Sequence, residues 1–256
     1  MLTCDAANIE IFYFVNMSRI GIVPVILVLA LAFAFVFAKD VKPYVDIDRM
    51  PNALAYYPAP PETTSAQFAY DVAQYKWGKS MRADSARAAL AVAQAVDNVA
   101  DMAKLFSEPF GMEISSWKTP AIMNVLERTV KTIRTGKFKN HYRRQRPFDR
   151  FNEPTLIPEH EDNLRKNGSF PSGHTARAWT FALVLVEINP DAADALLKYA
   201  YEWGQSRVIA GYHWQSDVDA SKVIVSAGFA RIHGEPEFLA DMQKAKAEFN
   251  KLKAKK

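Results

Sequence analysis

The sequence has almost no cysteine. Its single cysteine, Cys4, lies near the N-terminus, ahead of all the motifs described below. The rest of the chain therefore has no disulfide and no thiol chemistry. A protein of this length can be stable without disulfides, because 49% of its residues are hydrophobic and suffice for a core.

Several other patterns are missing. No segment of useful length alternates hydrophobic and polar residues with period two, which argues against a sheet. There is no glycine-rich phosphate loop, no internal repeat and no H-x-x-H or H-E-x-x-H metal motif. The formal net charge is only +4, without the clustered excess typical of nucleic-acid binders. We therefore expect an all-α protein that binds no nucleic acid, no metal ion and no cofactor.

An uncharged apolar run, Ile20–Ala38, follows Arg19 near the N-terminus. It reads as a secretory signal, with Met17–Arg19 as the basic start and Val36–Ala38 as a small-residue cleavage site. It is also just long enough for a membrane anchor, which needs about 20 apolar residues. Pro24 and the alanine- and phenylalanine-rich end favour a cleaved signal. Either interpretation sends the domain across a membrane, to the periplasm or the exterior.

Three regions follow from this pattern. Residues 1–38 form the leader, residues 39–64 a proline-rich extended segment, and residues 65–256 a single helical domain. Apolar residues spaced three and four apart predict the helices of this domain, and a loop is expected at Phe148–Asn167. The expected helices are Ser65–Met81, Ser85–Leu105, Pro120–Thr135, Ser172–Ile188, Asp191–Ile209, His213–His233 and Phe238–Lys256.

Three short motifs carry the chemistry. Lys139–Pro147 reads K-x6-R-P, Pro171–His174 reads P-S-G-H, and Ser206–Asp217 reads S-R-x5-H-x3-D. Together they supply three long cationic side chains, a Ser-Gly turn, two histidines and one carboxylate. Such a set suits a protein that binds a tetrahedral oxyanion and attacks it.

The P-S-G-H motif stands at the start of an apolar helix. A helix N-terminus offers unpaired N–H groups and the positive end of the dipole, both of which bind phosphate oxygens. Gly173 allows close approach of the backbone, and the Ser172 hydroxyl adds a donor. Taken alone, the same residues would read as an ordinary turn and helix start.

The three cations would complete a phosphate-binding cage. Arg146 and Arg207 offer planar, two-pronged contacts, and Lys139 offers a point charge. The competing interpretation is a solvated basic face, which is the commoner fate of a basic run. It remains open for Arg143 and Arg144.

His213 and Asp217 are four residues apart and share one face of a helix that begins near His213. A carboxylate on Nδ1 would hold the imidazole in one tautomer and leave Nε2 free as a nucleophile. His174 would protonate the leaving alcohol and then activate water. Without its partners, a histidine beside Trp214 and Tyr212 would more often be a buried structural residue.

The other histidines give weaker signals. His141 is expected at the surface, and His160 lies in an acidic loop where it is more simply solvated than metal-bound. His233 closes a helix, where a partial positive charge is favourable. None of the three is assigned to the site.

The motif pattern resembles the phosphatidic acid phosphatase type 2 and vanadium haloperoxidase superfamily. Within it, the chain is most similar to the class A bacterial nonspecific acid phosphatases, through the runs Gly168–Thr175 and Tyr201–Asp219. The resemblance extends over about residues 50–250. Phe170 departs from it, since many members have tyrosine there.

The resemblance implies a single-domain helical bundle of this superfamily's kind and a homo-oligomer. It implies a metal-independent acid phosphatase that hydrolyses soluble phosphomonoesters through a phosphohistidine on His213. Asp217 would orient that histidine, and His174 would act as acid and base. Within the basic run, the resemblance extends the phosphate-binding role to Lys139 and Arg146 only.

Three alternatives share the motifs. A lipid phosphate phosphatase, anchored through Ile20–Ala38, would usually have several membrane spans, and this chain has one candidate. A vanadate-dependent haloperoxidase would usually be much longer. An inactive phosphate-binding protein would be expected to have lost His213 or His174, and both are present.

Overall fold

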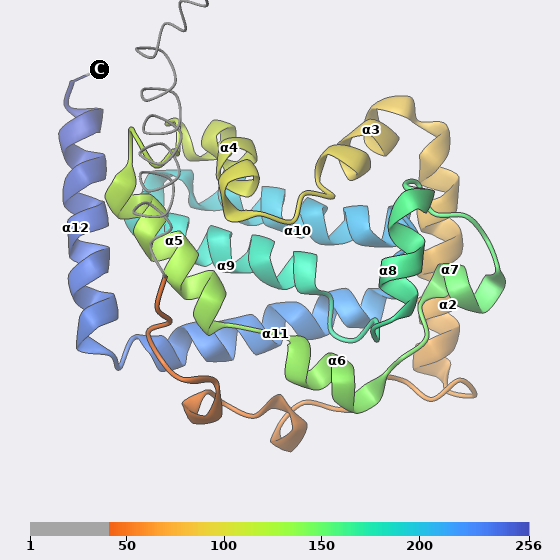
Figure 1. Ribbon diagram of the computed structural model, residues 1–256. Coiled ribbons are helices and arrows are strands. Elements are labelled where there is room, and N and C mark those ends of the chain that lie inside the picture. Colours follow the sequence, from red (N-terminus) through yellow and green to blue (C-terminus); the bar gives the residue numbers. More distant parts are fainter. Residues whose placement is uncertain (1–40, 256) are drawn as a thin grey trace, which may run out of the picture. The chain divides into compact units, whose positions relative to one another are not determined.

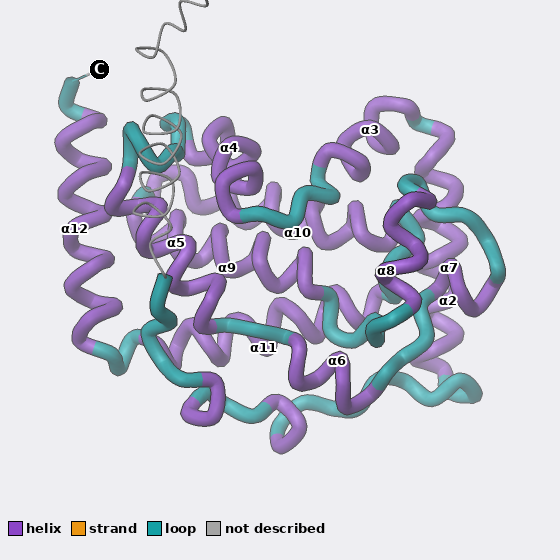
Figure 2. Tube along the Cα trace, viewed as in Figure 1, coloured by secondary structure: helices purple, strands orange, loops and turns teal. Residues whose placement is uncertain are grey.

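The computed structural model describes residues 41–255. This part of the chain consists of helices and loops, with no strand (Figure 2), which confirms the prediction of an all-α fold. The apolar run Ile20–Ala38 and both interpretations of it lie outside the described residues.

The helices follow the expected order but differ at their ends. The α-helices are α2 (Ala66–Ser80), α3 (Ser85–Ala93), α4 (Val99–Phe110), α5 (Pro120–Thr132), α6 (Gly136–Tyr142), α7 (Pro147–Phe151), α8 (Glu161–Arg165), α9 (Gly173–Ile188), α10 (Ala193–Ile209), α11 (Gln215–Ile232) and α12 (Pro236–Lys253). Short 3-10 helices lie at Ile47–Arg49, Ala53–Ala55, Met81–Ala83, Pro158–His160 and Pro190–Ala192.

The helix α9 is the centre of the fold. It runs between α10 and α11 and contacts both (Figure 1). Its buried residues, among them Ala178, Phe181 and Leu185, lie on several sides of the helix, as expected for a helix enclosed by others. The helices α5 and α12 pack against each other at one end of this group, and α2 packs against α10 at the other.

The helix α2 approaches α10 closely because Gly78 has no side chain. A Cβ at this position would lie 2.9 Å from the carbonyl oxygen of Val208, which is backbone and cannot move aside. The close approach brings the buried Asp71 of α2 next to the start of α11, where Ser216 binds it. The contact between Asp71 and Ser216 is important for the candidate site, because Ser216 precedes Asp217 on α11.

Two predicted segments are wrong in detail. The single helix expected at Ser85–Leu105 is two helices, because Asn98 caps α4 by accepting the N–H of Asp101 at 2.8 Å. The loop expected at Phe148–Asn167 contains most of α7, a 3-10 turn and α8. Prolines at Pro147 and Pro158 begin two of these elements.

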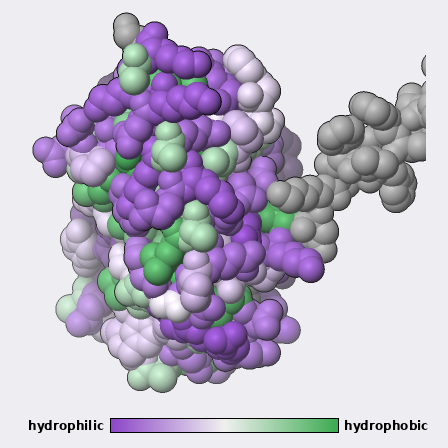
Figure 3. All heavy atoms as spheres, turned by 90° about the vertical axis from the view of Figure 1, so that its left-hand side faces the viewer, coloured by the Kyte–Doolittle hydropathy of each residue, from purple (hydrophilic) through white to green (hydrophobic). Residues whose placement is uncertain are grey.

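The surface around α12 is largely hydrophilic, with small hydrophobic areas between the polar ones (Figure 3). The apolar face of this helix is turned inward, where Phe238, Met242, Ala245 and Phe249 are buried. Within residues 41–255, no helix combines the length and the hydropathy needed to span a membrane.

Candidate active site

Backbone hydrogen bonds bring the second and third motifs together. The N–H of Ser172, at the start of α9, donates to the carbonyl of Asp217 on α11 at 3.0 Å. The N–H of His213 donates to the carbonyl of Arg207, at the end of α10, at 3.3 Å. The ends of three helices therefore meet at one place, although their motifs are far apart in the sequence.

His213 and Asp217 form the expected pair. The Nδ1 of His213 lies 3.3 Å from Oδ2 of Asp217, and both side chains are buried. The helix α11 begins at Gln215 and not near His213, so the predicted boundary is wrong. Asp217 still reaches back over the helix start, where its Oδ2 also accepts the N–H of Trp214 at 2.9 Å.

The partners of His213 determine its tautomer. Its Nε2 lies 3.3 Å from Nη1 of Arg146, and a guanidinium can only donate. The Nε2 atom therefore carries the lone pair, and Nδ1 donates its proton to Asp217. Burial, and then Arg146, lower the pKa of His213 well below its usual value, although Asp217 opposes the shift. His213 stays neutral and nucleophilic into the acidic range.

The start of α9 has the geometry of a capped helix N-terminus, which can bind an anion. Ser172 is the N-cap, and its hydroxyl oxygen accepts from the N–H and the hydroxyl of Thr175 at 3.3 and 2.9 Å. Because Ser172 accepts both bonds, its own hydroxyl hydrogen is available to a ligand. A Cβ on Gly173 would lie 3.6 Å from Oγ1 of Thr135 and 3.8 Å from Cε of Lys139, so it would lie beside the lysine of the first motif.

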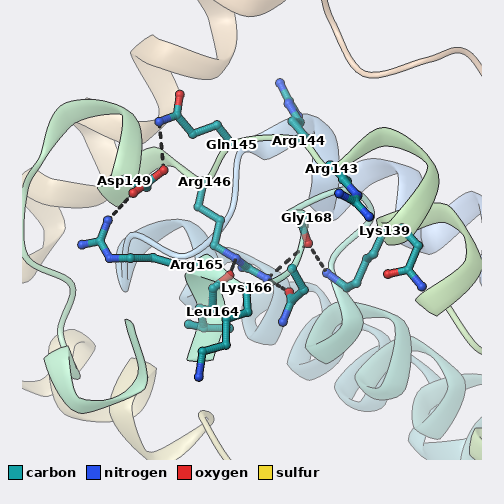
Figure 4. Close-up of a pocket in the computed structure, with 12 residues that line it drawn as sticks. Lys139, Arg143, Arg144, Gln145, Arg146, Asp149, Leu164, Arg165, Lys166 and Gly168 are labelled. Carbon is teal, nitrogen blue, oxygen red and sulfur yellow. Dashed lines mark hydrogen bonds and ion pairs between the residues drawn. The ribbon is translucent and has the colours of Figure 1, made fainter. Parts of the chain in front are cut away.

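Lys139 and Arg146 meet over the carbonyl of Gly168. The Nζ of Lys139 donates to this oxygen at 3.0 Å, and Nη2 of Arg146 donates to it at 3.3 Å (Figure 4). Burial, and then Arg146, lower the pKa of Lys139 to about 7. Burial likewise lowers the pKa of Arg146 to about 10. A bound anion would reverse both shifts, because it would compensate the positive charge.

Arg207 is fully buried and incompletely paired. Its Nη2 donates to the carbonyl of Ala91 at 2.6 Å, whereas Nε and Nη1 have no hydrogen-bond partner among the described residues. Burial lowers its pKa to about 10. Buried donors without partners are rare in proteins and costly to leave so. An anionic ligand is the simplest group that would satisfy them.

His174 lies opposite a carboxylate that the sequence did not indicate. Its Nε2 is 3.1 Å from Oδ1 of Asp97 without the geometry of a hydrogen bond, and Arg177 donates to the same oxygen at 2.7 Å. Burial lowers the pKa of His174 to about 4, against the opposing effect of Asp97. Arg207 and Arg177 lower it further.

Two substitutions should therefore shift the pKa of His174 in opposite directions. In Asp97→Asn, loss of the carboxylate should lower the pKa, whereas in Arg177→Gln, loss of the cation should raise it. An NMR titration of the imidazole protons checks both. Equal shifts of the same sign would show that Asp97 and Arg177 do not act on His174 through charge.

The sequence did not decide whether Arg143 and Arg144 belong to the site or to a solvated basic face. In the structure, Arg144 lies beside Asp217. Its Nη1 donates to Oδ1 of Asp217 at 2.6 Å, whereas Arg143 is exposed and has no side-chain partner in residues 41–255. His141 and His160 are exposed, and His233 binds Glu187 at the end of α11. These histidines lie where the sequence placed them.

A cavity of about 430 Å³ lies on the Gly168 side of the first motif, and Lys139 and Arg146 line it (Figure 4). Gly168 also lines this cavity. A Cβ there would lie 2.7 Å from the carbonyl oxygen of Lys139 and 2.9 Å from Cα of Arg143. Both neighbours are backbone, so the loop itself would have to shift.

We expect Gly168→Ala to weaken phosphate binding about tenfold, because the shift would move Lys139 and Arg146. Gly136→Ala is the matched control, since a Cβ at Gly136 meets nothing within 4 Å. Titration calorimetry with orthophosphate measures both affinities. Equal affinities for the two variants would contradict a positioning role for Gly168.

The donor set of the site suits an anion and not a metal ion. Its side chains are three cations, two histidines, a serine and two carboxylates, Asp217 and Asp97, which are already paired with Arg144 and Arg177. Across residues 41–255, no three histidine, cysteine, aspartate or glutamate side chains gather as metal ligands. The arrangement can hold a tetrahedral oxyanion and present a neutral imidazole to it.

Comparisons with known proteins point to one family. Residues 121–233 match the family model described as the PAP2 superfamily. A non-specific acid phosphatase of Providencia stuartii is 44% identical over 205 residues, which are 79% of this chain and 82% of that protein. One of Salmonella typhimurium is 38% identical over 83% and 86% of the two chains. An acid phosphatase of Zymomonas mobilis is 33% identical over 79% and 77%.

Proposed function

The chain belongs to the PAP2 superfamily and, within it, to the class A bacterial non-specific acid phosphatases, and from this premise we propose how it works. It hydrolyses soluble phosphomonoesters without a metal ion, through a phosphohistidine on His213. The observation that carries the proposal is the position of Nε2 of His213, buried 3.3 Å from the Arg146 guanidinium, which can only donate and so leaves the lone pair on Nε2. A nucleophile next to an anion-binding cation suits attack on a phosphate group.

In the first step, the phosphate oxygens bind Lys139, Arg146, Arg207 and the start of α9, and Arg146 moves from Nε2 to the ligand. The Nε2 atom then attacks phosphorus, so that a P–N bond forms while the P–O ester bond breaks. The leaving oxygen takes a proton from His174. The three cations stabilise the charge that spreads over the equatorial oxygens.

In the second step, water attacks the phosphorus of the phosphohistidine. Neutral His174 accepts a proton from this water, the P–N bond breaks and orthophosphate leaves. The positive charge that His213 carries during the cycle faces Asp217. Burial alone would raise the pKa of Asp217, but Arg144 and His213 hold it below the usual value, so the carboxylate stays ionised.

These pKa values favour activity at acidic pH. The first step needs protonated His174, whose pKa of about 4 means that the protonated fraction rises as the pH falls. His213 remains neutral in this range because its own pKa is lowered. The rate of the first step should therefore increase below neutrality and decrease again when His213 or Asp217 is protonated. The second step needs neutral His174 and slows once this histidine is mostly protonated, so turnover should peak at mildly acidic pH.

The test is hydrolysis of p-nitrophenyl phosphate by the purified full chain in EDTA, from about pH 4 to pH 8. We expect activity that survives EDTA and peaks below neutrality. Activity that EDTA abolishes would contradict the metal-free mechanism. An inactive protein that instead hydrolyses phosphatidic acid, or oxidises bromide when vanadate is added, would replace the proposal by one of the two related activities.

We also propose that the protein is exported as a homo-oligomer. The support for export is the sequence of Ile20–Ala38 with its basic start, read as a signal or an anchor. Residues 39–64 would then connect the leader to the helical domain of residues 65–256. Mass spectrometry of the protein from the periplasm would show whether the chain begins after Ala38.

A further inference from the structure

Behind the pair of His213 and Asp217 lies a second buried ion pair. The two terminal nitrogens of Arg144 bind different carboxylates: Nη1 binds Oδ1 of Asp217 at 2.6 Å, and Nη2 binds Oδ2 of Asp71 at 2.7 Å. Asp71 and Asp217 are fully buried, and the Arg144 side chain is 9% exposed. Asp71 belongs to α2 and Asp217 to α11, so Arg144 connects two helices to the first motif.

Arg144 is not a further phosphate ligand. Its side chain points away from that of Arg146, although the two residues are close in the sequence (Figure 4). Its Nη1 also donates to the hydroxyl of Ser216 at 2.8 Å. The guanidinium is thus committed to protein partners, in contrast to Arg207, which retains two unpaired nitrogens.

Asp71 holds the start of α11 as well as Arg144. Its Oδ1 accepts the N–H of Ser216 at 2.8 Å, and its Oδ2 accepts the Ser216 hydroxyl at 2.6 Å. The N–H groups of a first helical turn have no partner within the helix. A carboxylate from α2 therefore caps the turn that carries Asp217.

We propose that Arg144 and Asp71 are positioning residues that fix the orientation of the Asp217 carboxylate, and through it the tautomer and direction of His213. The inference rests on the proposed function, since it assigns these residues a role in the phosphohistidine step. Neither residue contacts the phosphate; both act through Asp217.

The two oxygens of Asp217 explain why the pair is needed. The Oδ2 atom serves His213 and the N–H of Trp214, and Oδ1 has Arg144 as its donor. A carboxylate is planar, so a donor on Oδ1 fixes the position of Oδ2. Without Arg144, a buried oxygen would lack a partner, and the carboxylate would rotate or take up a proton.

Charge and orientation can be separated by substitution. The charged and titratable groups that face Asp217 are Arg144, His213, Arg146 and Lys139. Arg144 lowers the pKa of Asp217, so its removal should raise that pKa. If Asp217 nevertheless stays ionised, the less compensated carboxylate should raise the pKa of His213. Both effects move the acidic limb of the pH–rate profile to higher pH.

The experiment compares three variants of the full chain by their pH profiles on p-nitrophenyl phosphate. Arg144→Gln should lower kcat about 100-fold, with KM within about threefold of wild type, and move the acidic limb upward. Arg144→Lys keeps the charge but replaces the two separate terminal nitrogens by one, so it cannot hold both carboxylates in the geometry that Nη1 and Nη2 give. It should lower kcat about tenfold without an upward shift of the limb. Asp71→Asn should behave like the lysine variant.

A matched control is the buried pair of Arg128 and Asp241, which joins α5 to α12 at 2.8 Å and touches no residue of the site. Arg128→Gln should lower the melting temperature but leave kcat and the pH profile unchanged. The inference is overturned if Arg144→Gln keeps wild-type kcat, or if its loss of activity comes without a shift of the acidic limb. An inactive wild-type protein would overturn the proposed function instead.

Discussion

Replacement of His213 by alanine is expected to lower kcat on p-nitrophenyl phosphate by about 10⁴-fold or more, as loss of a covalent nucleophile does in other hydrolases. The reason is that no other described side chain takes its place. Arg146, which lies 3.3 Å from Nε2, can only donate, and Asp217 is committed to donors on both oxygens. Steady-state kinetics at the wild-type pH optimum measure the loss.

The control for this variant is His160→Ala, since His160 is an exposed histidine outside the site. It should keep wild-type kinetics. Thermal melting of both variants shows whether the folded state survives. A folded His213→Ala protein that retains a tenth of the wild-type kcat would refute covalent catalysis at this residue.

His174→Asn is expected to show a loss that depends on the leaving group. Because His174 donates the proton to the departing oxygen, its removal matters most when the leaving alcohol is a poor anion. We expect kcat/KM on an alkyl phosphate to fall about 10⁴-fold, but on p-nitrophenyl phosphate only about 10²-fold. The p-nitrophenolate ion leaves readily without a proton.

Two measurements on His174→Asn complete this test. With p-nitrophenyl phosphate, dephosphorylation should become rate-limiting, and a burst of p-nitrophenol should precede the steady state, because the variant also lacks the base for water. Equal losses on both substrates would contradict the role as general acid. They would instead suggest that His174 only binds the phosphate.

The residues that bear the motifs could be found from sequence because their chemistry shows in the residue types. Arg207 and the two histidines stand out by residue type and spacing, and the start of α9 follows from Ser172 and Gly173. Lys139 and Arg146 could equally belong to a solvated basic face, and only the family resemblance assigns them to the site. The all-α fold followed from the spacing of apolar residues. Each of these predictions depends on residues close together in the sequence, and the structure adds the distances between their side chains.

The supporting residues could not be found in the same way. Asp97 lies in the linker between α3, which ends at Ala93, and α4, which Asn98 caps, whereas the alanine-rich pattern suggested one continuous helix. Asp71 is 146 residues from Asp217 in the sequence (217 − 71 = 146). It joins the hydrogen-bond network around Asp217 only because the packing of α2 brings it there. Arg144 is one of several basic residues in a row, and only its partners distinguish it from Arg143.

The most direct test of the account is to trap the phosphoenzyme. The protein is mixed with a ³²P-labelled phosphomonoester, quenched in alkali and digested, because phosphohistidine survives alkali and is lost in acid. The account predicts an acid-labile label on the peptide that contains His213, formed in EDTA and missing from His213→Ala. A label on another residue, or one that persists in His213→Ala, would contradict it.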